Sequence, residues 1–232
     1  MPFFLSDQKP ELQEYMDDPD ADRKKLDRTY RQFKTINQLI SRWHFIYCQH
    51  LLPDMKKLNR PATVLDIGSG GGDILFNLVK WARQDGIEIR ITGIDADYRA
   101  LDFVRQLEVP DPIQFKQLHT SDLMQSGETF DYVISNHLMH HLAPDPLQQL
   151  LHDAKTLSRR RVLFNDIERS DLGYLLFSSI APLLFHNSFA VKDGKISIKR
   201  SYTRAELLQL VSDEWKLQSV FPYRLILSYI HE

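Results

Sequence analysis

Hydrophobic and polar residues alternate along this chain in a pattern that predicts successive strands and helices. Apolar positions recur every three or four residues from Leu26 to Tyr47, which predicts one long amphipathic helix that ends near Pro53. From Ala62 onward, short β-favouring runs alternate with helical stretches, and this alternation predicts a parallel sheet with helices on both faces. Five such strands are expected, at residues 64–68, 89–94, 113–118, 132–136 and 161–167.

Both ends of the chain carry further predicted elements. A short helix is expected near the N-terminus, over residues 11–16. After the fifth strand we expect an apolar helix over 172–185, a hairpin over 191–196 with an Asp-Gly turn, a helix opened by the capping box Thr203-x-x-Glu206, and two strands at 215–221 and 223–230. The organisation predicted is a helical cap over residues 1–58 and an α/β domain over residues 59–232.

A glycine-rich turn follows the first predicted strand. Asp66 lies in that strand, and Gly68, Ser69, Gly70 and Gly72 follow before the next helix begins. Glycines there allow positive φ and a close approach of the backbone to a ligand. The dinucleotide fingerprint requires Gly or Ala at the sixth position from Gly68, where this chain has Asp73. A carboxylate there opposes a pyrophosphate but not a ligand with sulfonium and ammonium groups.

The spacing Asp66-x-Gly68-x-Gly70-x-Gly72 resembles the first motif of the class I S-adenosylmethionine (SAM) methyltransferases. That resemblance implies a Rossmann-like fold: a doubly wound, seven-stranded, mostly parallel sheet with an antiparallel C-terminal hairpin, here with an N-terminal helical lid. It also implies that SAM is the cofactor and that residues at the strand ends bind it. By resemblance, Asp95 holds the ribose, Ala96 borders the adenine, Asp122 and the backbone of Leu123 contact the adenine ring, and Asn136 lies near the methionine part.

Three histidines follow the fourth predicted strand, where the acceptor and the methyl group are expected to meet. His137, His140 and His141 are spaced so that they share a helical face. One of them can act as a general base, all can be structural, or they can bind a metal. The metal alternative comes from a resemblance to the ubiquinone-pathway O-methyltransferases, which have Glu-x-x-Glu-His at this place; this chain replaces both Glu residues by His. We assign His140 and His137 as candidate catalytic residues and no metal ligand.

Other features narrow the choice of substrate. Asp166, at the end of the fifth strand, is expected to help orient the acceptor. The apolar stretch 172–185, together with Trp43 and Tyr47 from the predicted lid, favours a lipophilic or aromatic acceptor. The function predicted is transfer of a methyl group from SAM to a small, partly apolar molecule at a hydroxyl oxygen, as in quinone-biosynthesis and polyketide-tailoring enzymes. The alternatives are carbon methylation of a quinol-like ring and a SAM-binding protein without catalysis.

Composition and charge limit the possible partners. The 232 residues carry a formal net charge of −2, which gives no electrostatic reason to expect a nucleic-acid partner, and the basic run 159–161 is interpreted as solvated surface. The single cysteine, Cys48, excludes a disulfide framework. No apolar run is long enough for stable membrane insertion, so a cytoplasmic protein is expected. Whether it forms a homodimer stays open.

Overall fold

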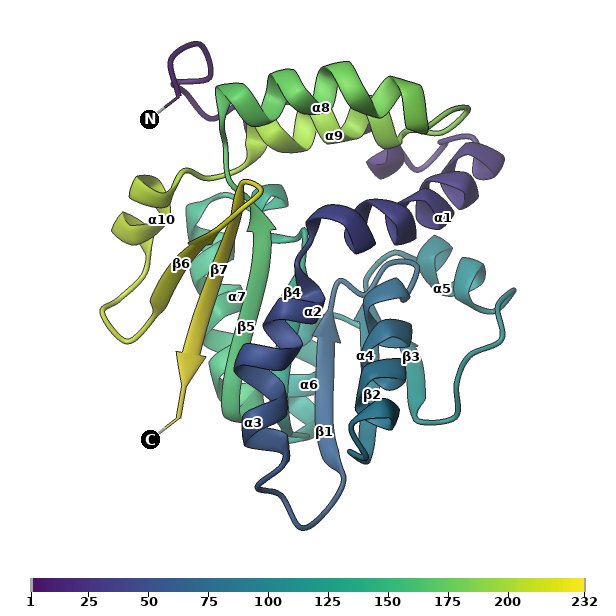
Figure 1. Ribbon diagram of the computed structural model, residues 1–232, viewed down its shortest axis with the longest axis vertical. Coiled ribbons are helices and arrows are strands. Elements are labelled where there is room, and N and C mark those ends of the chain that lie inside the picture. Colours follow the sequence, from purple (N-terminus) through teal and green to yellow (C-terminus); the bar gives the residue numbers. More distant parts are fainter. Residues whose placement is uncertain (1, 232) are drawn as a thin grey trace.

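A central sheet of seven strands organises the fold (Figure 1). The computed structural model describes residues 2–231. The strand order is β3-β2-β1-β4-β5-β7-β6; the first five strands run parallel, and β7 runs antiparallel to both of its neighbours. The strands are β1 (Ala62–Ile67), β2 (Ile89–Asp95), β3 (Ile113–Gln117), β4 (Phe130–Asn136), β5 (Ser158–Ile167), β6 (Lys216–Val220) and β7 (Arg224–Ile230). The predicted fold class, with its antiparallel C-terminal hairpin, is confirmed.

Helices cover both faces of this sheet. On one face lie α2 (Trp43–Ile46), α3 (Leu52–Met55) and α4 (Asp73–Gln84). The opposite face is covered by α6 (Thr120–Ser126), α7 (Pro144–Leu157) and α10 (Arg204–Leu210). The central strands β1 and β4 are buried almost throughout, because helices cover them from both sides.

The carboxyl edge of the parallel strands is covered by a third set of helices. Figure 1 shows α8 (Asp171–Leu184) and α9 (Ala190–Arg200) lying across the top of the sheet, with α1 (Arg23–Ile40) beside them. The helix α5 (Tyr98–Val104) packs against α1 through Phe103 and Tyr30. In open parallel sheets this is the edge where ligands bind, so these helices roof the place where a site is expected.

The predicted hairpin at residues 191–196 is wrong, because this segment lies inside α9. The Asp193 carboxylate accepts hydrogen bonds from the backbone N–H groups of Tyr15 and Met16. Gly194 is needed for packing: a Cβ added there would collide with the ring of Phe177 on α8. The Asp-Gly pair therefore joins two helices and the N-terminal segment, and a local turn rule could not reveal these long-range contacts.

The long helix predicted from Leu26 to Tyr47 is interrupted. It ends at Ile40, and Arg42 adopts a left-handed conformation with φ of 61° before α2 begins. The backbone C=O of Ser41 accepts a hydrogen bond of 2.7 Å from the Asn165 amide in β5. The chain then continues through the π-helical turn η2 (Tyr47–Leu51) into α3. A contact with a residue far along the chain stabilises the break, and the apolar periodicity alone did not signal it.

Two smaller elements also differ from the predictions. Of the short helix expected over residues 11–16, only the 3-10 turn η1 (Tyr15–Asp17) forms near that place. The helix α6 was not predicted; it is short, and its capping box uses His119 and Asp122. The capping box of Thr203 and Glu206 that opens α10 is confirmed.

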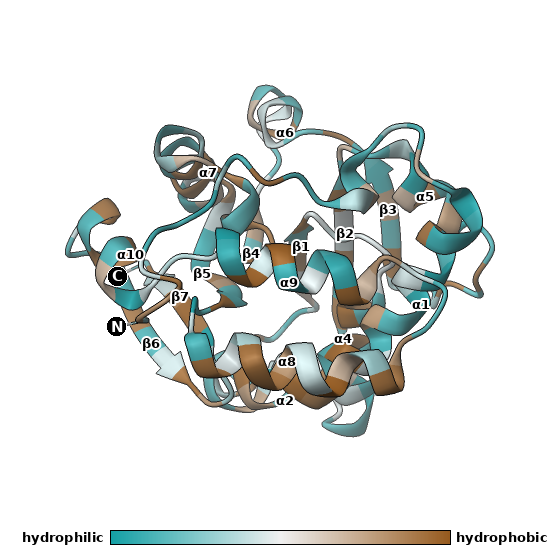
Figure 2. Cartoon of the chain, turned by 90° about the horizontal axis from the view of Figure 1, so that it is seen from above, coloured by the Kyte–Doolittle hydropathy of each residue, from teal (hydrophilic) through white to brown (hydrophobic). Residues whose placement is uncertain are grey.

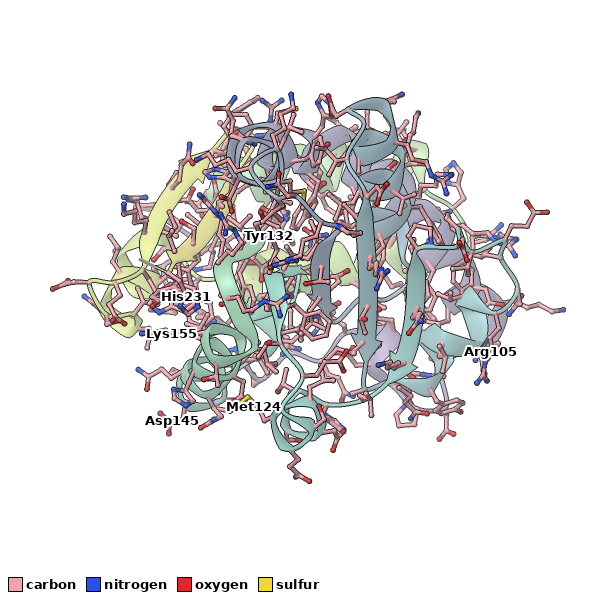
Figure 3. The ribbon with its side chains drawn as sticks, turned by 90° about the horizontal axis from the view of Figure 1, so that it is seen from below. Arg105, Met124, Tyr132, Asp145, Lys155 and His231 are labelled. Atoms are coloured by element: carbon pink, nitrogen blue, oxygen red, sulfur yellow. The ribbon has the colours of Figure 1, made fainter. Side chains whose placement is uncertain are left out.

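The basic run 159–161 lies at the start of β5, at the end of the parallel strands opposite the roofed edge. Arg160 forms an ion pair with Asp54, and Arg159 lies 3.3 Å from an oxygen of Asp131. Tyr132, which is labelled in Figure 3, donates a hydrogen bond of 2.8 Å to the same Asp54 carboxylate. Carboxylates of the chain therefore pair with part of this run. Among the helices described, none combines the length and the apolar character needed to cross a membrane.

Candidate active site

The glycine turn forms one wall of a cavity of about 530 Å³ at the roofed edge. Gly68, Gly70 and Gly72 all have positive φ, between 49° and 76°. A Cβ at Gly72 would lie 2.6 Å from the Phe115 ring, so only glycine fits at this position. The N–H of Gly70 donates a hydrogen bond of 2.8 Å to Asp95, which ties the turn to the end of β2. The turn and the strand end are therefore held as one unit.

Three carboxylates without a cationic partner among residues 2–231 surround this turn. Asp66 is 2% exposed, and its Oδ1 has no hydrogen-bond partner in that range. Burial, reinforced by the charges of Asp73 and Asp95, raises the pKa of Asp66 well above its usual value. Burial also raises the pKa of Asp73 to about 6 and increases the pKa of Asp95. A cationic ligand would relieve this accumulated negative charge, and an anionic one would add to it.

A second, smaller cavity adjoins the first. Gly68, Asp95 and Leu138 belong to the walls of both, and Ala96 lines only the smaller one. The remaining wall is largely apolar, which suits a flat heterocycle such as adenine. The wall includes Ile67, Ile94, Leu118, His119, Thr120, Leu142, Pro146, Gln149, Leu150 and Asp153.

The structure does not bring Asp122 and Leu123 to either cavity. The exposed Asp122 carboxylate accepts a hydrogen bond of 2.8 Å from the N–H of His119 and so caps its own helix. Leu123 is buried in the core. His119 and Thr120 line the smaller cavity instead. They lie next to the end of β3, and ligands bind at the carboxyl ends of parallel strands, so this rule applied closely would have selected them.

A chain of amide side chains crosses the floor of the large cavity. The Asn37 amide donates to Asp73 at 3.1 Å, and the Asn136 amide donates to Asn37 at 3.3 Å. Asn136 in turn accepts from Asn165 at 3.1 Å and from Arg224 at 3.2 Å. Asn136 is thus at the cavity, as predicted, but Asn37 and Arg224 were missed. They come from the cap helix and the last strand, and no local motif marks them.

His140 is buried between two carboxylates. Its Nδ1 lies 2.7 Å from Asp166, and its Nε2 lies 3.4 Å from Glu14. Burial opposes the charged form, but the two carboxylates outweigh it and raise the pKa of His140 to about 9. The imidazole is therefore protonated at neutral pH, and both ring nitrogens are occupied. In this state His140 donates protons to its neighbours and cannot accept one from a substrate.

The predicted helical face of three histidines does not form. His137 has φ of 61° and lies before the 3-10 turn η3 (Met139–His141). Glu14, and not His137, lies beside the other two histidines. One possible metal-binding atom from each of Glu14, His140 and His141 lies within 4.8 Å of the other two. The Glu14 oxygen is 3.8 Å from Nε2 of His141 and 3.4 Å from that of His140. These three residues could hold a metal ion, but as they stand they form an ion-paired cluster.

His137 differs from His140 in every respect that matters for proton transfer. Its Nε2 is buried and lacks a hydrogen-bond partner within residues 2–231. Burial, with the nearby Arg224 charge, lowers the pKa of His137 well below its usual value, although Asp166 opposes this effect. The ring is therefore neutral, and it lies in the cavity wall. Of the two predicted catalytic histidines, only His137 has a ring nitrogen free to accept a proton.

The outer part of the large cavity is apolar. Phe33 and Ile36 of α1 face Leu176, Phe177 and Ile180 of α8 across it. Seen from above, α8 carries mainly hydrophobic residues along its length (Figure 2). An apolar acceptor fits this chamber.

Two aromatic residues of the predicted lid are not part of this chamber. Trp43 and Tyr47 are buried in the core beside α4, and Tyr47 donates a hydrogen bond of 2.9 Å to Asp85. Their expected contact with the acceptor is wrong, because the break at Arg42 turns this part of the chain down the face of the sheet.

Comparison with known proteins agrees with the fold. Residues 64–160 match the family model described as "Methyltransferase domain". No curated protein sequence matches the chain. Among solved structures, the plantazolicin methyltransferase BpumL in complex with SAH, the demethylated form of SAM, has a TM-score of 0.65 at 16% identity and covers 94% of this chain and 93% of its own. The magnesium protoporphyrin IX methyltransferase of Synechocystis PCC 6803 with bound SAH has a TM-score of 0.53 at 15% identity, over 83% and 84%.

Proposed function

We propose that this chain, which has the class I methyltransferase fold, is a SAM-dependent methyltransferase and that it methylates a hydroxyl oxygen of a small, partly apolar acceptor. The observation that carries the proposal is the continuity of the two cavities. Gly68, Asp95 and Leu138 belong to both, and the large cavity beyond them contains the three carboxylates as well as the apolar chamber. A nucleoside and an acceptor bound on the two sides would meet at His137.

The residues present fit SAM. Asp95 is suited to the ribose hydroxyls, and Ala96 with the apolar wall of the smaller cavity to the adenine. The backbone of the glycine turn, together with Asp66, would surround the methionine part beside Asn136. We assign no adenine contact to Asp122 or Leu123. His119 and Thr120, which line the smaller cavity, are assigned these contacts instead. When bound, SAM supplies an activated methyl group, so the enzyme needs only to align the acceptor and exclude water.

In this proposal His137 accepts the proton of the acceptor hydroxyl. A low pKa suits that role, because the oxygen becomes strongly acidic as the methyl group is transferred and a weak base suffices. His140 and Asp166 act as positioning residues: their ion pair holds the turn that follows His137. Asp166 also accepts a hydrogen bond of 2.9 Å from the backbone N–H of His140, which fixes that turn against β5.

We propose that residues 1–58 serve as a cap over the cavity, on the domain formed by residues 59–232. Tyr30, Phe33 and Asn37 of α1 line the chamber, and Glu14 meets His140 at its edge. The cap therefore contributes side chains to both the cofactor and the acceptor sides. Removing it would expose the chamber to water.

The test measures SAH formation and the methylated product, by mass spectrometry, with hydroxylated aromatic acceptors that do or do not carry a carboxyl group. The position of the methyl group by NMR separates oxygen from carbon methylation. We expect His137→Ala to lower kcat by about 100-fold or more, since a general base contributes on that scale. His152→Ala, at an exposed position on α7, is the control and should be unchanged. Full activity of His137→Ala would remove this residue from the mechanism.

A further inference from the structure

Arg224 is a buried cation without a close ion pair among residues 2–231; the Asp166 carboxylate acts on it only from beyond 4.0 Å. The Arg224 side chain is 1% exposed, and no carboxylate of residues 2–231 lies within 4.0 Å of its nitrogens. Nε donates to Asn165 and Nη2 donates to Asn136, each at 3.2 Å. Nη1 is buried and has no hydrogen-bond partner in the same range. An unpaired charge with an unsatisfied donor is among the costliest arrangements in a protein interior.

The other fully buried arginine of the chain shows that this arrangement is exceptional. Arg169 donates to the carbonyl oxygens of Leu5 at 2.9 Å, Ser201 at 2.6 Å and Ser6 at 3.0 Å. It also forms an ion pair with Glu206. All of its nitrogens are therefore satisfied by the protein, whereas Arg224 keeps one unused. A buried residue kept unsatisfied beside a cavity is typical of a site that a ligand completes.

A second unsatisfied group lies beside Arg224. Nε2 of His137 is likewise buried without a partner, and His137 directly follows Asn136, which Arg224 contacts. Both residues contribute to the wall of the large cavity. The two orphan nitrogens thus lie at the same edge of the sheet, in side chains that belong to the wall of one cavity.

The Arg224 guanidinium and the apolar wall of the cavity indicate which class of ligand would bind there. A guanidinium binds planar carboxylates in preference to other groups, and charge-assisted hydrogen bonds of this kind are stronger than neutral ones. The neighbouring His137 stays free to accept the proton of the acceptor hydroxyl. The rest of the chamber is apolar, with Leu176, Phe177 and Ile180 on α8. The matching molecule has a hydrocarbon or aromatic body and one carboxyl group.

We propose that Arg224 forms a subsite for a carboxylate beside His137, so that the acceptor of this enzyme is an apolar organic acid. This inference rests on the proposed function, because it names the substrate class of that same cavity. Arg224 binds the carboxylate and orients the acceptor; it takes no part in the transfer itself.

The test compares two probes of the same shape, decanoate and decanamide, by calorimetry on the full chain with SAH bound. Decanoate should bind the wild-type protein at least tenfold more tightly than decanamide. Arg224→Gln should weaken decanoate binding by about 10- to 100-fold, the range expected for a hydrogen bond to a charged group, and should leave decanamide binding unchanged. Arg105→Gln, at an exposed position far from the cavity (Figure 3), is the matched control.

Equal affinities of the two probes for the wild-type protein would overturn the inference, and so would unchanged decanoate binding by Arg224→Gln. The comparison of decanoate with decanamide on the wild-type protein tests the inference even if Arg224→Gln does not fold. SAH affinity is measured in the same experiment. Loss of the acid preference with normal SAH binding refutes only the carboxylate subsite, whereas failure of the wild-type protein to bind SAH refutes the proposed function.

Discussion

The two ends of the large cavity carry opposite unpaired charges. At the glycine turn, Asp66, Asp73 and Asp95 are carboxylates without a cationic partner, and burial raises the pKa of each. At the far end, Arg224 is a buried cation without a close ion pair among residues 2–231; burial lowers its pKa to about 10, and the more distant Asp166 charge only partly opposes this. A structure that needed only stability would pair such groups with one another. Keeping them apart prepares one end for a cation and the other for an anion.

Unlike these unpaired groups, His140 and Asp166 form a buried ion pair. Breaking this pair should have the largest of the effects predicted here, a loss of stability. Asp166→Asn removes one member of a buried ion pair and is expected to lower the free energy of unfolding by about 3–5 kcal/mol. Asp66→Asn, at the glycine turn, removes a charge that has no partner and should leave the stability of the ligand-free protein unchanged or increase it. Urea unfolding measures both. Equal destabilisation by the two variants would contradict the distinction between a paired and an unpaired carboxylate.

The second prediction separates the two ends by ligand. Asp95→Ala removes a carboxylate suited to two ribose hydroxyls and should weaken SAM binding by about 100-fold, as expected for two hydrogen bonds to a charged group. Binding of decanoate at the other end should stay within a factor of about two. Asp111→Ala, an exposed residue before β3, controls for the general loss of an acid. If Asp95→Ala weakened both ligands alike, the two ends would not be independent.

The third prediction concerns pH and has the smallest effect. Because the pKa of Asp73 is raised to about 6, this carboxyl group holds a proton below that pH and must lose it to favour a cation. The dissociation constant of SAM is therefore expected to rise as the pH falls below 6, by at most tenfold per unit. Asp73→Asn should bind SAM more weakly but with a flatter profile between pH 5 and pH 7. The same slope in wild type and variant would assign the titration to another group.

The cofactor end could be predicted from the sequence because its parts are local. Asp66 and the glycines lie within one strand and its following turn, and Asp95 lies at the next strand end, so strand alternation and the ligand rule for parallel sheets suffice to place them. Asp122 was predicted to contact the adenine, because the short helix α6 was not predicted. An acidic residue in the first turn of a helix can cap that helix as readily as bind a ligand.

The acceptor end could not be predicted in the same way because its residues meet only through tertiary pairing. Glu14 reaches His140 from the N-terminal segment, and Arg224 reaches Asn136 from the last strand. Nothing near Glu14 or Arg224 in the chain marks them as part of a site. His140 was correctly placed near the cavity, but its charge depends on Asp166 and Glu14 together. Only the fold reveals that it is protonated and that His137 is not.

The central claim is that the carboxylate-lined end of the cavity binds SAM. Isothermal titration of the full chain with SAM, and separately with NAD, tests it most directly. We predict saturable binding of one SAM per chain and no detectable binding of NAD, whose pyrophosphate meets the carboxylates at the glycine turn. Binding of NAD with no heat from SAM at millimolar concentration would contradict the account.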